Sequence, residues 1–68
     1  MKRLTLRDAR LGAGLTQHGL AKKSGVAQST IANLEVGHAA QPRFHTACAL
    51  AAAMELDPRV LKFGARFV

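Results

Sequence analysis

The stretch TQHGLAKKSGVAQSTIANLE, residues 16–35, decides the fold of this chain. Thr16 is a favourable N-cap for a first short helix, because its hydroxyl can accept a hydrogen bond from the first turn. Gly25 ends that helix, since glycine readily takes the left-handed conformation that a tight turn between helices needs. After the turn, Ile31 and Leu34 give a second helix an inward apolar face. The stretch therefore predicts two short helices joined by a tight turn.

The second of these helices carries an outward face without charge. Its members follow one another at the spacing i, i+1, i+4 and i+5, which places side chains on one side of a helix. They are Gln28, Ser29, Ala32 and Asn33. Gln and Asn amides pair with the adenine edge in the DNA major groove, Ser bonds several bases, and Ala contacts the thymine methyl group. This composition suits contacts with base edges, with an ordinary solvated helix face as the alternative.

The length and the charge of the chain favour a nucleic-acid partner. Its 68 residues form one small domain, 1–68, and carry ten Lys or Arg against four Asp or Glu, a net charge of +6. Such a basic domain has the electrostatic character of a nucleic-acid binder. A merely well-solvated surface has the same charge, but Lys22, Lys23 and Arg43 lie in or near the segments expected to face phosphates.

Cysteine and histidine usage argues against a disulfide framework or a metal site. Cys48 is the single cysteine, and the three histidines lack the spacing of metal ligands. With no signal peptide and no long apolar run, the sequence predicts a cytoplasmic protein without membrane contact. No cofactor is expected. An enzyme is not expected either, because the few acidic residues and scattered histidines form no acid–base or nucleophile arrangement.

Three further helices are expected around the central pair. The first begins at the N-cap Thr5 and turns an apolar stripe inward, formed by Leu6, Ala9 and Ala13. The fourth runs from about residue 43 to residue 54, and its buried side is drawn from Phe44, Ala47, Cys48, Leu50, Ala51 and Met54. A short fifth helix follows Asp57-Pro58, because proline suits a first helical turn. Its apolar face is formed by Val60, Leu61 and Phe63.

From about residue 6 to residue 61 the chain resembles the phage repressor/Cro-like helix-turn-helix family. The residues that carry the resemblance are Thr16, Gln17, Leu20, Ala21, Gly25, Val26, Ile31, Glu35 and Gly37, followed by Pro42, Thr46, Leu50, Ala51, Asp57, Pro58 and Leu61. The resemblance implies an all-α, compact five-helix lambda-repressor-like domain with the motif at about residues 16–36. It also implies sequence-specific binding of double-stranded DNA by a repressor-like transcriptional regulator.

The resemblance also assigns roles to particular residues. Gln28, Ser29 and Asn33 match the base-reading positions of the recognition helix, and Ala32 lies on the same face. Gln17 matches a position that binds a backbone phosphate at the start of the second helix, where free N–H groups attract anions. Arg43 and the backbone of Phe44 match a second phosphate clamp. With the residues chosen by position, the predicted phosphate-binding set is Thr16, Gln17, Lys22, Lys23, Arg43 and Phe44. Arg10 and Glu35 match a structural pair that bridges the first helix to the end of the third.

Three departures from the family pattern lower the expected stability without touching the reading face. Ala9 is smaller than the aliphatic residue that is common at its position. Gly19 lies inside the second helix, where glycine costs about 1 kcal/mol relative to alanine. Ala27 stands at the N-cap of the third helix in place of a capping hydroxyl, a change that also costs about 1 kcal/mol.

A homodimer on a palindromic operator is the expected assembly, because dimerisation multiplies the affinity of a small module. The apolar residues expected to join the copies are Val60, Leu61, Phe63, Phe67 and Val68. One rival function is an antitoxin-like DNA-binding adaptor that also binds a toxin protein. A second rival is a basic membrane-surface or protein-interaction module, which the uncharged face of the third helix disfavours.

Overall fold

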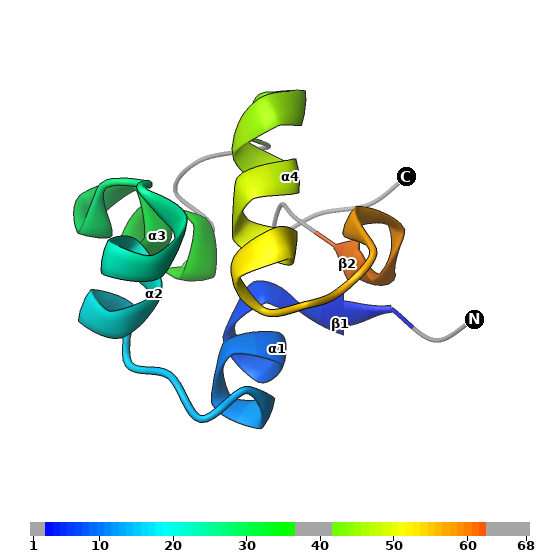
Figure 1. Cartoon of the computed structure of the whole chain (residues 1–68), viewed down its shortest axis with the longest axis horizontal. Coiled ribbons are helices and arrows are strands. Elements are labelled where there is room, and N and C mark those ends of the chain that lie inside the picture. The colour runs from blue at the N-terminus through cyan, green and yellow to red at the C-terminus, as the bar shows by residue number, and fades with distance from the viewer. Residues whose placement is uncertain (1–2, 37–41, 63–68) are drawn as a thin grey trace.

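The computed structural model describes residues 3–36 and 42–62 of the chain. Its helices are α1 (Leu6–Gly12), α2 (Gln17–Ser24), α3 (Gln28–Val36) and α4 (Phe44–Ala53). A single 3-10 turn, η1 (Pro58–Val60), and the short strands β1 (Leu4–Thr5) and β2 (Leu61–Lys62) accompany them. In Figure 1, α4 runs through the middle of the molecule, with α2 and α3 on one side and the two strands on the other.

The core forms where α2, α3 and α4 meet. Leu20 of α2, Ile31 of α3 and Leu50 of α4 are fully buried, one from each helix. The remaining buried apolar side chains surround them: Leu6, Ala9, Leu34, Ala51, Ala53, Met54 and Leu61. Because α2 packs against both α3 and α4, the position of α3 is fixed by the same apolar contacts that stabilise the domain.

Threonine caps begin the first two helices, as predicted. The Thr5 hydroxyl accepts a hydrogen bond from the Asp8 backbone N–H at 3.1 Å, and the Thr16 hydroxyl accepts one from the Gly19 N–H at 2.9 Å. Each cap satisfies an N–H that has no partner within its own helix. The predicted inward stripe of the first helix is wrong at Ala13, which lies beyond the last residue of α1 and is exposed.

The expected fifth helix is replaced by one 3-10 turn and a strand. Asp57 caps the turn by accepting the Arg59 N–H at 2.9 Å, and the chain is extended again by Leu61. Leu61 then pairs with Leu4 in a parallel two-stranded sheet. The prediction failed because this pairing requires an extended Leu61, which a continued helix excludes. The described part is therefore mostly helical, with four α-helices and a small sheet.

Two apolar positions differ from their predicted environments. Phe44, expected on the buried side of the fourth helix, is 82% exposed, because it is the first residue of α4 and lies beyond the core that Leu50 and Ala51 reach. Leu61, expected at a dimer surface, is buried, and Val60 packs against the core. Phe63, Phe67 and Val68, the other members of that predicted surface, lie outside the described residues.

Candidate nucleic-acid interface

The turn between α2 and α3 is held by local hydrogen bonds. Gly25 has φ of 78°, the left-handed conformation expected for it, and its N–H donates to the Ala21 carbonyl at 2.9 Å. The Val26 N–H donates to the Ser24 hydroxyl at 3.1 Å. These contacts turn the chain within three residues, so that α3 starts at Gln28. The angle between the two helices is therefore set by the turn as well as by the core.

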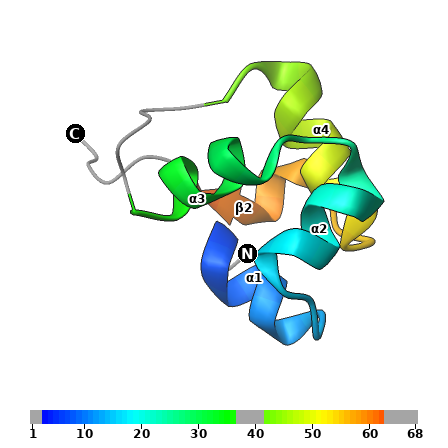
Figure 2. The same ribbon diagram turned by 90° about the vertical axis from the view of Figure 1, so that its left-hand side faces the viewer.

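Helix α3 has one buried side and one solvent-facing side. Ile31 and Leu34 are buried in the core, while Gln28, Ser29 and Asn33 are exposed. Ala32, the fourth predicted base-reading residue, is half-buried. Figure 2 views the molecule from the side that carries α2 and α3. All four residues thus come from one helix, with three of them open to solvent.

A buried ion pair joins the last turn of α3 to α1. Arg10 of α1 donates from Nε to Glu35 Oε2 at 2.6 Å and from Nη2 to Glu35 Oε1 at 3.1 Å. The side chains are only 10% and 4% exposed, respectively. A third donor of Arg10, Nη1, reaches the Leu15 carbonyl at 2.9 Å. Arg10 therefore links α1 and the segment before α2 to the C-terminal turn of α3.

Burial and hydrogen bonding act in opposite directions on the Glu35 carboxyl. Burial raises its pKa, but the hydrogen bonds from Arg10 and Gln17, together with the charges of Arg10 and Arg7, outweigh burial and hold the pKa below its ordinary value. The hydrogen bond to Glu35 in turn raises the pKa of Arg10. Both groups are therefore charged when the protein is folded at neutral pH.

The predicted phosphate-binding residues at the start of α2 have different environments. Thr16 is exposed and caps the helix, as described above. Gln17 is half-buried, and its Nε2 donates to Glu35 Oε1 at 3.1 Å. Sequence reasoning did not identify this contact, because no spacing rule connects residues that lie on separate helices. The structure thus joins a predicted phosphate-binding residue to the Arg10–Glu35 pair.

The start of α4 is the second predicted clamp. Arg43 and Phe44 are both exposed, and Arg43 provides no side-chain cap for the helix. The Ala47 N–H donates to the Arg43 carbonyl at 2.9 Å, which begins the helical hydrogen bonding of α4. The N–H groups of the preceding helical residues have no acceptor within the helix, so this terminus can accommodate an anion.

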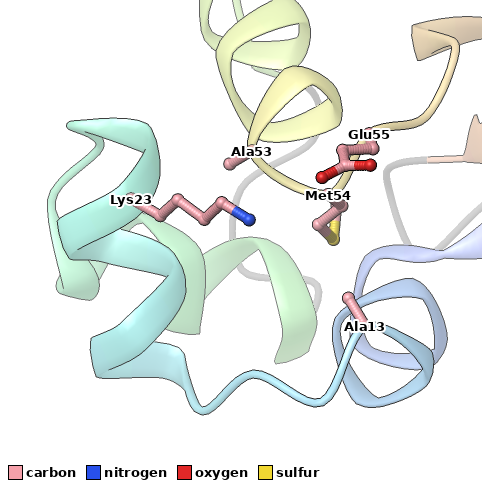
Figure 3. Close-up of a pocket in the computed structure, with 5 residues that line it drawn as sticks. All are labelled: Ala13, Lys23, Ala53, Met54 and Glu55. Carbon is pink, nitrogen blue, oxygen red and sulfur yellow. The ribbon is translucent and has the colours of Figure 1, made fainter.

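The two adjacent lysines of α2 are exposed. Lys23 extends toward the C-terminal end of α4, where it lines a pocket with Ala13, Ala53, Met54 and Glu55 (Figure 3). Arg43 lies at the opposite end of α4, and a ten-residue helix is about 15 Å long. The structure therefore does not bring Lys23 together with the Arg43 clamp.

Other kinds of site find little support in the described residues. Among residues 3–36 and 42–62, no three His, Cys, Asp or Glu side chains are grouped as metal ligands would be. Cys48 is half-buried on α4 and has a free thiol. No helix within these two ranges is both long enough and apolar enough to cross a membrane.

Comparison with known families agrees with this arrangement. A family model described as helix-turn-helix matches residues 6–61, which is most of the chain. The chain belongs to the helix-turn-helix family. The match confirms the resemblance to phage repressor and Cro-like proteins, and it supports a DNA-binding regulator. Searches of curated proteins and of solved structures gave no match.

Proposed function

We propose that this helix-turn-helix protein binds double-stranded DNA at specific sequences and acts as a repressor-like transcriptional regulator. In this proposal α3 enters the major groove, and Gln28, Ser29, Ala32 and Asn33 contact base edges. The observation that carries the proposal is the exposed, uncharged polar face of α3 on a helix whose other face is anchored in the core. Anchoring matters because base contacts require a helix held at a defined angle.

The phosphate contacts come from the N-terminal ends of two helices. Gln17 at the start of α2 and Arg43 with the Phe44 backbone at the start of α4 bind the DNA backbone on the two sides of α3. Two observations support this assignment. The Arg43 side chain is exposed, and it makes no capping hydrogen bond to the first turn of α4, whose N–H groups can therefore bind an anion. Thr16 and Lys22 lie on α2 or at its start, and we include both in the phosphate-binding set. Lys23 is the weakest member, since it extends toward Glu55.

The protein acts as a homodimer on a palindromic operator in this proposal. A single small module reads only a few base pairs, and two copies related by a two-fold axis multiply the affinity and match two half-sites. Selection of binding sites from random duplexes tests this directly. Inverted half-sites spaced by about one helical turn, 10 base pairs, support the dimer, and a single unrepeated half-site contradicts it.

The central test separates base reading from phosphate binding. Gln28→Ala and Asn33→Ala should each cost about 1–3 kcal/mol on the best operator and relax the preference at particular base pairs, because base edges differ with sequence. Gln17→Ala and Arg43→Ala should weaken binding to all sequences about equally, because phosphates do not differ. Affinities on the operator and on scrambled duplexes, with a repeated site selection, measure both effects.

Arg59→Ala is the matched control for Arg43→Ala. Both residues are exposed arginines, but Arg59 lies in η1 and pairs with Asp57 at 2.9 Å. Removing Arg59 should leave operator affinity unchanged. An unaltered selected motif in Gln28→Ala would show that α3 is not the reading helix.

A further inference from the structure

One carboxylate connects three helices. Glu35 of α3 accepts from Arg10 of α1 at both oxygens, and its Oε1 also accepts from Nε2 of Gln17, at the start of α2. Gln17 is half-buried and Glu35 is nearly inaccessible, so water competes poorly for this contact. The side-chain amide of Gln17 is therefore oriented before any ligand arrives.

The geometry of an amide group determines which hydrogen-bond donor of Gln17 remains free for a ligand. Gln Nε2 carries two N–H donors in the plane of the amide group. When one N–H donates to Glu35, the planar group fixes the direction of the other. A free glutamine side chain loses rotamer freedom on binding, whereas a pre-oriented one has already lost it during folding. The contact with Glu35 thus lowers the entropic cost of an anion contact by Gln17.

Arg10 allows the negatively charged Glu35 to lie next to a residue that is proposed to bind a phosphate. An isolated carboxylate next to a bound phosphate would repel it, but the Arg10 guanidinium neutralises the Glu35 charge through two hydrogen bonds. The same bonds fix the carboxylate plane, so that Oε1 faces Gln17. Arg10 and Glu35 therefore form a neutral unit that orients a polar group at the start of α2.

We propose that Glu35 is a positioning residue for DNA binding, which holds the Gln17 amide ready for a backbone phosphate while Arg10 holds Glu35. This inference rests on the proposed function, in which Gln17 contacts a phosphate. It adds a role for the ion pair beyond structural support. Since a phosphate contact does not depend on sequence, the pair contributes to affinity and leaves base preference unchanged.

A double-mutant cycle tests the proposal. The pair is removed by Arg10→Leu with Glu35→Leu, because replacing both charges keeps the site apolar and avoids an unpaired buried ion. In the natural chain, Gln17→Ala should weaken DNA binding about tenfold on every sequence, which corresponds to about 1.4 kcal/mol. Without the pair, Gln17→Ala should weaken binding by about threefold or less. The site motif selected by the double-leucine variant should be the natural one.

The outcomes of the cycle are distinct. If Gln17→Ala weakens binding by the same factor with and without the pair, DNA binding stands and the positioning role is rejected. If the double-leucine variant selects a different motif, the pair acts by setting the angle of α3. If Gln17→Ala has no effect in the natural chain, the phosphate clamp itself is wrong, while the base-reading test of Gln28 and Asn33 decides the function separately.

A second measurement uses the natural chain and needs no variant to fold. In an acid titration followed by NMR, the side-chain amide protons of Gln17 should shift with the same midpoint as the Glu35 carboxyl carbon, because protonation changes the acceptor. The side-chain amides of Gln28 and Asn33, exposed on α3, serve as controls and should not follow that midpoint. A Gln17 amide that ignores the ionisation of Glu35 would overturn the proposal.

Discussion

At the scale of single residues, Glu35 determines most of the buried polar structure. Its carboxylate is the acceptor for Arg10 and for Gln17, and Arg10 is the buried polar residue of the described ranges. A buried carboxylate that loses its partners costs about 3–5 kcal/mol, a large part of the stability of so small a domain. The ionisation of this one group should therefore be visible in the stability of the whole protein.

We predict that acid destabilises the protein through Glu35. Its pKa in the folded state is below the unfolded value, so the folded state binds fewer protons, and the resulting stability is present above the ordinary pKa. That stability is lost as the pH falls from about 5 toward the folded pKa. Urea unfolding across this range should show a falling free energy of unfolding, and Arg10→Leu with Glu35→Leu should flatten most of the fall.

Two other carboxylates, those of Asp57 and Glu55, provide a comparison and a control for this prediction. The hydrogen bond from the Arg59 side chain also lowers the pKa of Asp57, but Asp57 is solvent-exposed, so its contribution is screened. Glu55→Gln is the matched control, because Glu55 is exposed and lies outside the ion pair. A Glu55→Gln variant that loses the acid dependence, or a natural chain without one, would contradict the role given to Glu35.

Residue-level prediction worked where a local rule applied. The Thr5 and Thr16 caps depend on three-residue spacing, which is visible in sequence, and both form as expected. The bond between Gln17 and Glu35 depends on the packing of two helices, so no local pattern contained it. The exposure of Phe44 was missed for a related reason: periodicity identifies a helix face but does not tell where along the helix the core ends.

At the scale of elements, the two glycines that lie within the described helices offer contrasting tests. A Cβ added at Gly12, the last residue of α1, would meet no atom within 4 Å. Gly12→Ala should therefore stabilise the protein by up to about 1 kcal/mol, because alanine favours the helix and restricts the unfolded chain. For a domain of this size, a gain of 1 kcal/mol raises the Tm by about 4–8 °C in calorimetry.

Gly19→Ala should gain less than Gly12→Ala. Its Cβ would lie 3.2 Å from the Thr16 hydroxyl oxygen that caps α2, so the cap must shift. Gly25→Ala is a control with the opposite expected sign. It should destabilise the protein, since the φ of 78° at this position is unfavourable for alanine. A Gly19→Ala gain equal to that of Gly12→Ala would show that the Thr16 cap tolerates the added methyl group.

The α-helices were predictable from the sequence, but the short strand β1 before them was not. Caps, glycine stops and apolar periodicity are local signals, and they predicted the four α-helices. The fifth element was predicted as a helix because Asp57-Pro58 resembles a helix start, and Asp57 does cap a turn there. What ended that turn after Val60 was the distant Leu4, which pairs with Leu61. Pairing between residues so far apart in the chain is not visible in any local sequence pattern.

At the scale of the whole molecule, the net charge of +6 leads to a prediction about salt. The logarithm of DNA affinity should fall linearly with the logarithm of salt concentration, with a slope of about −0.9 for each phosphate neutralised. A dimer with about eight phosphate contacts gives a slope of about −7. Fluorescence anisotropy with labelled operator across a salt series measures it, and Arg43→Ala, which removes one contact from each subunit of the dimer, should reduce the slope by about two units.

A flat salt dependence would contradict the electrostatic part of the proposed function. Arg59→Ala is again the control: Arg59 pairs with Asp57, and it should leave the slope unchanged. The family and the general architecture were accessible from the sequence because the residues that carry the resemblance are spread over residues 6–61, most of the chain. The predicted dimer surface was not accessible in the same way, since the burial of Leu61 and the partial burial of Val60 depend on the complete tertiary structure.

The parallel pairing of β1 with β2 also bears on the order in which the molecule folds. Leu4 and Leu61 come from the two ends of the described chain, so their contact closes nearly the longest loop available and brings a correspondingly large entropic cost. The contacts between α2 and α3 span a short loop and form at little cost. We therefore expect the helical pair to assemble early and the strands to join last. Fraying of this sheet would then open the molecule on the side away from α2 and α3, and leave the candidate DNA-binding face intact.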